Sequence, residues 1–352
     1  MRIFLTHIVP KDKIIECGVS MACCNFSYNL ISGHGFDKIY SILPSFVNRQ
    51  HNFNTDGNIE ILYSSVRNSL LYKIAPLVEN IILFKKIKKN TSLWLYNITV
   101  LNVLLFTLLK LFKPSVKIYI IVLDFTPNFI NSFCFLKYIK ASNGLICLAN
   151  SSLFKNKNKL CLPGVVPTEV PEYPKVTSVN KSFLISGVLS DNIAMLPMLL
   201  DAFSRMPDLT LHITGKIQDN EIFKSYLEKY QNIFYHGMVE YNEYLNILHN
   251  TTFLLSTRNP MSSENQCNFP SKIIEALLHN RIIISTIRYA QLNGIEYFYV
   301  PSDTEGFINS LQCIVNKPHD DLLVYANQAS KVKQRFNVKV WNDAMNTIEK
   351  TV

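Results

Sequence analysis

Short apolar runs that alternate with helical patterns constrain the fold of this chain more than any other feature of its sequence. Several runs are apolar throughout, as expected for parallel strands that helices cover on both faces. This alternation predicts an α/β domain in the first half of the chain. Strands are expected there at 2–9, 38–43, 59–63, 93–96, 116–123 and 145–149, and helices at 20–31, 74–84, 100–112 and 129–139.

The second half repeats the alternation in a cleaner pattern. Helices are expected between its first two strands, near Tyr241 and Pro270, and at 338–350. Glycine at a strand end lets a ligand approach the backbone closely. Strands are expected in SFLISG, LTLHITG, NIFYHG, TTFLLST, IIIST and YFYVP, and the first three end in Gly187, Gly215 and Gly237.

A proline-rich segment separates the two halves. Residues 160–180 contain four prolines and one glycine and show no helical pattern, which is typical of an interdomain linker. We expect an α/β fold with two doubly wound, Rossmann-like domains that face a cleft, with ligands beyond the carboxyl ends of the strands. The expected division is a first domain at 1–165, a linker at 166–180, a second domain at 181–335, and a C-terminal helix at 336–352 that can pack back on the first domain.

The composition indicates a globular protein with unevenly distributed charge. Of the 352 residues, 48% are hydrophobic and 17% are charged, which excludes an intrinsically disordered chain. Residues 1–160 contain 19 Lys/Arg and 7 Asp/Glu, a net charge of +12, whereas residues 161–352 contain 16 and 19, a net charge of −3. A basic first half suits nucleic acid, an anionic membrane or a phosphorylated substrate.

Neither a metal site nor a secreted protein is expected. The eight cysteines form no C-x-x-C pair or His/Cys cluster at metal spacing, and the chain contains no D-x-D. The start, MRIFLTHIVPKD, is interpreted as a strand and not as a signal peptide. Asn and Thr interrupt the apolar residues 93–112, so a buried strand and a buried helix are favoured there over a membrane span. We therefore expect a cytoplasmic protein.

The stretch NFPSKIIEALL places Pro-Ser-Lys at the start of a predicted helix. Pro270 suits the first turn, and the N–H groups of Ser271 and Lys272 would favour an anion there, such as a diphosphate. Glu275, three residues after Lys272, can accept hydrogen bonds from a ribose diol. The alternative is an ordinary capped helix with a surface Lys–Glu pair, and the residues alone leave both interpretations open.

Three blocks of the second half resemble the donor-binding half of glycosyltransferases with the GT-B fold. They are GVLSDNIAMLPMLLDAFSRMPDLTLHITG, YHGMVEYNEYLNIL and STRNPMSSENQCNFPSKIIEALLHNRIIIST, and they are most similar to the family-4 type that builds bacterial surface polysaccharides. The first half is similar only in layout. The resemblance implies a nucleotide-sugar donor on the second domain, an acceptor on the first, and a diphosphate that is usually managed without metal or another cofactor.

The resemblance also implies roles for single residues. Glu275 matches the glutamate that holds the donor ribose, and Gly187 matches the glycine whose backbone faces the phosphate. Ser271 and Lys272 match the helix start that holds the diphosphate. Gly215 and Phe269 complete the expected donor site.

The sequence departs from the family pattern at three places. A second glutamate usually lies eight positions before the ribose one, where this chain has Cys267, so Glu264 is the candidate replacement. No basic residue follows Gly187 closely, and Arg258 and Lys216 are the candidates to supply that charge, since a cation or a helix end must meet the departing diphosphate. The third departure is the missing histidine before Asp124.

Three residues of the first half are candidates for the acceptor side. Asp124 follows an apolar strand and can activate the acceptor or cap the next helix. His7, near the end of the first strand, can bind the acceptor, although such a histidine is more often a polar residue of the core or rim. Ser20 can bind the acceptor or cap the first helix.

The run KKIKK at 85–89 follows an apolar helix. It is either a solvated helix end, with lysines that match the helix dipole, or a patch that binds anionic lipid. A basic first domain would suit a lipid diphosphate acceptor at the inner face of the plasma membrane.

We expect a hexosyltransferase that moves a sugar from a nucleoside-diphosphate sugar to a glycan or lipid-linked glycan in the synthesis of a surface polysaccharide, such as O-antigen, lipopolysaccharide or capsule. The first alternative is a nucleotide-sugar epimerase of the same fold, although no matching set of acid and base groups is found. The second is a basic nucleic-acid-binding protein. It is disfavoured because the aromatic residues lie within apolar runs rather than between lysines and arginines.

Overall fold

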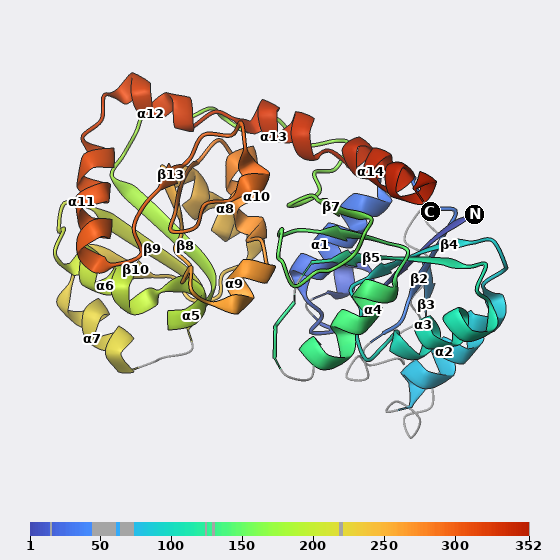
Figure 1. Cartoon of the computed structure of the whole chain (residues 1–352). Coiled ribbons are helices and arrows are strands. Elements are labelled where there is room, and N and C mark those ends of the chain that lie inside the picture. Colours follow the sequence, from blue (N-terminus) through green and yellow to red (C-terminus); the bar gives the residue numbers. More distant parts are fainter. Residues whose placement is uncertain are drawn as a thin grey trace. The chain divides into compact units, whose positions relative to one another are not determined.

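The computed structural model describes residues 1–14, 16–43, 61–63, 74–123, 125–128, 131–217 and 221–351. The chain divides into two compact units, and each is built around its own sheet (Figure 1). Unit 1 comprises Met1–Val170, Cys267–Phe269 and Phe336–Val352. Unit 2 comprises Pro171–Gln266 and Pro270–Arg335.

Unit 1 contains a parallel sheet in the order β3-β2-β1-β4-β5-β6-β7. All six strands expected in this half are present, with shorter bounds in most cases. The seventh, β7, was not expected; it lies at the start of the proline-rich residues 160–180, before the linker expected at 166–180. The strands are β1 (Arg2–Thr6), β2 (Lys38–Ser41), β3 (Ile61–Tyr63), β4 (Ser92–Tyr96), β5 (Lys117–Val122), β6 (Gly144–Cys147) and β7 (Lys159–Cys161).

Helices cover both faces of this sheet, since alternate residues of each strand point to opposite sides. The face that contains Ile3 and Leu93 packs against α2 (Ala75–Lys86), α3 (Val103–Phe112) and α4 (Leu136–Ala141), the last preceded by a π-helix at Asn131–Phe135. The other face contains Trp94 and is covered by α1 (Met21–Ile31) and α14 (Val338–Lys350).

Residues 93–112 form a strand and a helix, as predicted. Strand β4 is buried as expected, whereas the ten-residue α3 is only partly buried and exposes Leu111 and Phe112 at its end. Within the ranges that the structure describes, no helix combines the length and hydropathy needed to cross a bilayer.

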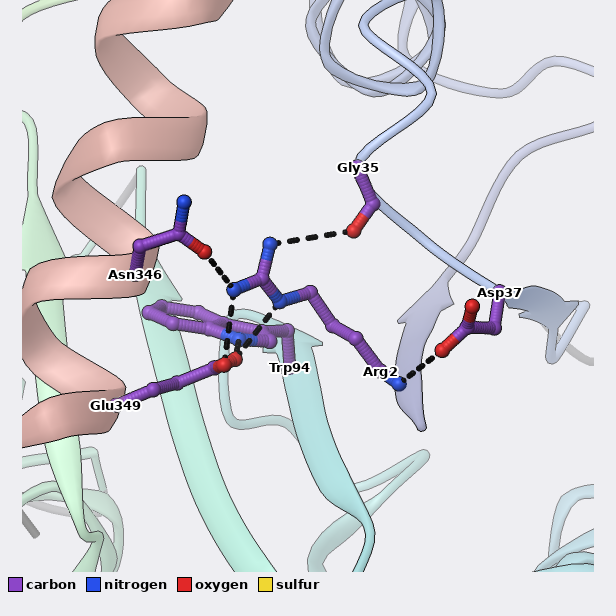
Figure 2. A network of polar contacts seen from close by, with 6 residues as sticks. All are labelled: Arg2, Gly35, Asp37, Trp94, Asn346 and Glu349. Atoms are coloured by element: carbon purple, nitrogen blue, oxygen red, sulfur yellow. Dashed lines mark hydrogen bonds and ion pairs between the residues drawn. The ribbon is translucent and has the colours of Figure 1, made fainter.

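A network of polar contacts joins the start of the chain to its end (Figure 2). The Arg2 guanidinium, at the beginning of β1, donates from Nε and Nη2 to the two carboxylate oxygens of Glu349, each at 2.8 Å. Trp94 Nε1 donates to Glu349 Oε1 at 2.7 Å, and Arg2 Nη2 also donates to Asn346 Oδ1 at 2.6 Å. This network fixes α14, drawn in red in Figure 1, to unit 1.

Unit 2 contains a parallel sheet in the order β10-β9-β8-β11-β12-β13. All six strands expected in this half are present: β8 (Ser182–Leu189), β9 (Thr210–Ile217), β10 (Ile233–Tyr235), β11 (Phe253–Ser256), β12 (Ile282–Ser285) and β13 (Phe298–Tyr299). The helices are α5 (Asp191–Ala194), α6 (Leu196–Ser204), α7 (Glu221–Lys229), α8 (Tyr241–Asn250), α9 (Ser263–Cys267), α10 (Ser271–Leu278), α11 (Thr304–Val315), α12 (His319–Tyr325) and α13 (Ala329–Phe336).

Two strands of unit 2 do not end where the sequence predicted. Strands β8 and β9 continue past Gly187 and Gly215 and remain paired as far as Leu189 and Ile217. Both glycines have positive φ, 128° and 117°, and they are partners in the register. Because both strands bend in the same way at the same level, the pairing between them continues past the two glycines.

Candidate functional site

Helix α10 begins near Pro270 as predicted, but Pro270 is its N-cap residue and not part of the first turn. Proline fixes φ near its helical value, here −73°, and lacks the N–H that would have no partner. Pro270 has no side chain that can cap the helix, and none of the described side chains makes a capping bond to it. The Ile273 N–H already donates to the Pro270 carbonyl at 3.1 Å. The N–H groups of Ser271 and Lys272 remain available to an anion at the positive end of the helix dipole.

The Glu275 carboxylate, one turn into α10, lies within a cluster of polar side chains. Lys272 Nζ donates to Glu275 Oε2 at 2.8 Å, and the Tyr244 hydroxyl of α8 donates to the same oxygen at 3.0 Å. The Lys272 ammonium also lies 4.0 Å from the centroid of the Tyr244 ring. The alternative interpretation expected a Lys–Glu pair, and that pair is formed, but the side chain of Glu275 is only 23% exposed.

Tyr244 keeps its proton in this cluster. Burial, and then the charge of Glu275, raise the pKa of the Tyr244 hydroxyl well above its ordinary value. A neutral hydroxyl donates to the carboxylate and orients it. A carboxylate has about four acceptor positions, so Glu275 can accept from further hydroxyl groups besides Tyr244 and Lys272.

Three glycines form a backbone cradle where β8, β9 and β10 approach their carboxyl ends. Gly187 has open space where a Cβ would lie, as does Gly237, which follows β10 with a φ of 72°. Gly215 instead lies against its partner, because a Cβ on it would lie 2.0 Å from the Gly187 carbonyl oxygen. The Gly215 N–H donates to the Gly237 carbonyl at 2.7 Å, which connects the three positions.

The candidate cations lie on two different strands of this sheet. Lys216 follows Gly215 in β9 and is exposed. Arg258 follows β11, and its backbone is held on both sides by Thr286, whose hydroxyl accepts from Arg258 N and donates to Arg258 O, each at 2.7 Å. Arg258 Nη1 donates to Asn265 Oδ1 of α9 at 3.2 Å, and the half-exposed Glu264 is the neighbour of Asn265.

Ser271 is exposed at the start of α10, whereas Phe269 is almost fully buried at 3% exposure. Phe269 and Cys267 belong to the three-residue segment counted with unit 1. Among the donor candidates, the structure brings Lys272 and Glu275 into direct contact.

The first-half candidates have different surroundings. His7 is buried, its Nδ1 lies 2.9 Å from the Ile42 carbonyl oxygen, and burial lowers its pKa, so it is a polar residue of the core. Ser20 caps α1, because its hydroxyl accepts from the Cys23 N–H at 3.3 Å. Asp124 lies outside the described residues.

The described residues bring together no group of three His, Cys, Asp or Glu side chains that could hold a metal ion. The sequence did not predict the part that Tyr244 plays. Tyr241 and Tyr244 lie one turn apart in α8, and their rings stack with centroids 6.1 Å apart. The sequence offered no local signal for the contact with Glu275, because Tyr244 lies 31 residues before it.

Comparison with known proteins identifies the fold. No protein-family model matches the chain. No curated protein matches it in sequence. Among solved structures, HepE from Anabaena in complex with UDP superposes with a TM-score of 0.69 at 13% identity and covers 100% of both chains. The lipopolysaccharide outer core galactosyltransferase WaaB gives 0.60 at 14% identity, over 100% of this chain and 99% of WaaB.

The chain has the GT-B fold. This confirms the predicted fold class of two parallel α/β domains. A third structure with this GT-B fold, AviGT4, a glycosyltransferase of avilamycin A biosynthesis, gives a TM-score of 0.60 at 11% identity over 99% of this chain and 97% of its own.

Proposed function

We propose that this GT-B protein is a glycosyltransferase that uses a nucleoside-diphosphate sugar. HepE has been solved in complex with UDP-glucose and with UDP and glucose, and WaaB is a galactosyltransferase. These relatives support a UDP-hexose donor and a glycan or lipid-linked glycan acceptor. We further propose that the protein is of the family-4 type and that it acts in the cytoplasm in the synthesis of a surface polysaccharide.

The observation that carries the proposal is the cluster at the start of α10. An uncapped helix N-terminus attracts a diphosphate, and Lys272 adds a full positive charge beside it. Lys272 has a 41% exposed side chain and a single bond to Glu275, so its ammonium can move to a bound phosphate. Glu275 then keeps the hydroxyls of Tyr244 and Tyr241 beside it and can accept further hydrogen bonds from the ribose hydroxyls.

This arrangement also provides for the departing nucleotide. Negative charge builds up on the diphosphate as the bond to the sugar breaks, and donors that are already oriented stabilise it. In the proposed mechanism, the α10 N-terminus and Lys272 perform this role without a metal, with Lys216 and Arg258 as further cations. Asp124 accepts a proton from the acceptor hydroxyl, and Glu264 contacts the donor sugar.

Thermal unfolding in the presence of a panel of nucleotide sugars tests the donor site. A ligand at about 100 times its dissociation constant stabilises a protein by about 2.7 kcal/mol. We expect a uridine-diphosphate sugar to stabilise the native chain and to do so far less for Glu275→Gln and Lys272→Glu. Glu305→Gln is the matched control, because Glu305 is an exposed acid of unit 2 on α11.

Turnover separates the proposed activity from its alternative. An epimerase converts a nucleotide sugar without an acceptor, whereas a glycosyltransferase leaves the sugar unchanged until an acceptor is added. Full transfer activity in a protein that carries both Lys272→Glu and Glu275→Gln would refute the proposal.

A further inference from the structure

Helix α2 of unit 1 has polar side chains turned inward and apolar side chains turned outward. Glu79 and Asn80 are 5% and 1% exposed, whereas Leu77 and Ile81 are 49% and 47% exposed. A helix on the surface of a soluble domain normally has the opposite pattern. The outward apolar residues of α2 therefore require an explanation.

The inward orientation of Asn80 is fixed by the neighbouring helix. Asn80 Nδ2 donates to the Leu101 carbonyl at 2.7 Å, and Asn80 Oδ1 accepts from the Leu105 N–H of α3 at 2.9 Å. This side chain supplies an acceptor to the first turn of α3 and cannot rotate outward without leaving that N–H unpaired. The exposure of Leu77 and Ile81 follows from the packing of α2 on α3.

The apolar stripe of α2 continues onto α3. Ile74, Leu77, Ile81 and Phe84 are spaced so that each is a neighbour of the next along the helix. The Phe84 ring meets the Phe112 ring of α3 edge to face, with centroids 6.2 Å apart. The α2–α3 face consists of exposed apolar residues that belong to this stripe or adjoin it: Ile74 (46%), Leu77 (49%), Ile81 (47%), Leu111 (68%) and Phe112 (65%).

The stretch that contains this face, residues 74–123, is almost exclusively positive in its charged side chains. Residues 74–123 contain seven lysines and one acidic residue, and that residue is the buried Glu79. Lys85, Lys86, Lys88 and Lys89 are exposed at the end of α2 and directly after it. Lys113 lies there too, with its ammonium 4.6 Å from the Phe84 centroid.

We infer that the α2–α3 face docks unit 1 on the surface of an anionic lipid bilayer. Exposed apolar side chains enter the boundary between headgroups and acyl chains, and the lysines meet lipid phosphates while their stems lie along the apolar layer. A second copy of the chain fits less well, because a symmetric contact through this face would oppose lysines to lysines. This inference goes beyond the proposed function and does not rest on it.

Vesicle co-sedimentation of the full chain tests the inference. We expect binding to phosphatidylcholine vesicles that contain phosphatidylglycerol, weak binding to phosphatidylcholine alone, and partial release by salt. A fourfold substitution, Lys85→Gln, Lys86→Gln, Lys88→Gln and Lys89→Gln, should weaken binding at least about a hundredfold, at about fivefold per lysine. Leu77→Gln with Ile81→Gln should weaken it about tenfold.

The matched control combines Val324→Gln, Lys317→Gln and Lys331→Gln, which alters exposed residues of unit 2 and should leave vesicle binding unchanged. Nucleotide-induced stabilisation, measured on the same variants, should stay at its native level, which separates this inference from the proposed function.

Hydrogen exchange of the native chain supplies a readout that needs no variant: vesicles should slow exchange in residues 74–89. The inference is overturned if the native chain does not bind anionic vesicles. An acidic protein partner would then be the better candidate to bind the α2–α3 face. The inference is equally overturned if Leu77→Gln with Ile81→Gln binds like the native chain, or if protection appears only outside the α2–α3 face.

Discussion

Two carboxylates, one in each unit, are held by similar partners with different consequences. Glu349 in unit 1 accepts from a cation, Arg2, and from an aromatic N–H, that of Trp94. Glu275 in unit 2 accepts from a cation, Lys272, and from an aromatic hydroxyl, that of Tyr244. The side chains of the two glutamates are similarly exposed, at 20% and 23%.

The difference lies in the cations. Arg2 forms two parallel bonds with a planar group, is 14% exposed, and is held by further bonds to Asn346 and Gly35. Lys272 forms one bond, is 41% exposed, and has a flexible stem. A bidentate arginine fixes structure, whereas a single lysine can exchange its partner for a ligand. The comparison indicates that the Glu349 cluster serves stability and that the Glu275 cluster serves binding.

The largest expected effect on stability tests this contrast directly. Glu349→Ala leaves the guanidinium of Arg2 and the N–H of Trp94 without their acceptor and should lower the free energy of unfolding of unit 1 by about 3 kcal/mol. Glu275→Ala should cost less, about 1 to 2 kcal/mol, because Lys272 can turn to water and only the buried Tyr244 hydroxyl loses an acceptor.

Tryptophan fluorescence during urea unfolding measures this effect, since both tryptophans, Trp94 and Trp341, are buried in unit 1. If Glu349→Ala and Glu275→Ala shift the urea unfolding transition equally, the proposed difference between a stabilising and a binding cluster is contradicted.

A smaller effect is expected from the paired glycines of β8 and β9. Gly215→Ala should destabilise unit 2 by about 2 kcal/mol, because its φ is unsuited to alanine and its Cβ would strike the Gly187 carbonyl. Gly187→Ala meets open space and should cost about 1 kcal/mol through φ alone.

Circular dichroism during urea unfolding reports on both units and, read against the tryptophan signal, isolates unit 2. A greater loss for Gly187→Ala than for Gly215→Ala would contradict this account of the cradle.

The smallest expected effect comes from acid. His279, at the end of α10, is stacked on Tyr173 with centroids 3.6 Å apart, and its Nδ1 lies 2.7 Å from His249 Nε2. Burial, and then His249, lower the pKa of His279 to about 4. Folding therefore favours the neutral ring, and this contribution is complete above the unfolded pKa of about 6.5 and is lost as the pH falls toward 4.

We expect unit 2 to lose about 1 kcal/mol between pH 7 and 5.5, measured by the circular dichroism transition. His279→Gln should flatten this dependence. In unit 1, burial lowers the pKa of His7. If acid lowers the stability of unit 1, measured by tryptophan fluorescence, more than that of unit 2, the prediction for His279 is contradicted.

Much of the fold could be predicted because its signals are local. Of the thirteen strands in the described part of the chain, twelve were expected from apolar runs, and the last helix, Val338–Lys350, was expected at its observed bounds. The exception, β7, has three half-buried residues at a sheet edge, and it lies between a run of Lys and Asn and the proline-rich segment, where no clear apolar run marks it. The strand ends at Gly187 and Gly215 were predicted wrongly, because a glycine often terminates a strand and here two bend together.

The candidate site was predicted only where it lies on one helix. Pro270, Lys272 and Glu275 are close in sequence, so helical spacing alone places Lys272 beside Glu275. Tyr244 is 31 residues from Glu275, and no local sequence pattern predicts their contact. The roles proposed for Asp124, Glu264, Lys216 and Arg258 stay predictions, since they depend on a bound donor and acceptor.

The sequence by itself determined the alternation of strands and helices, the two parallel sheets and the helix start at Pro270, because side-chain period and proline geometry act over a few residues. Only the tertiary structure decided that Arg2 meets Glu349 across 347 positions, that Tyr244 orients Glu275, and that α2 turns Leu77 outward. These features depend on packing between elements that are distant in the chain, and packing selects among side-chain arrangements that local preferences leave equal.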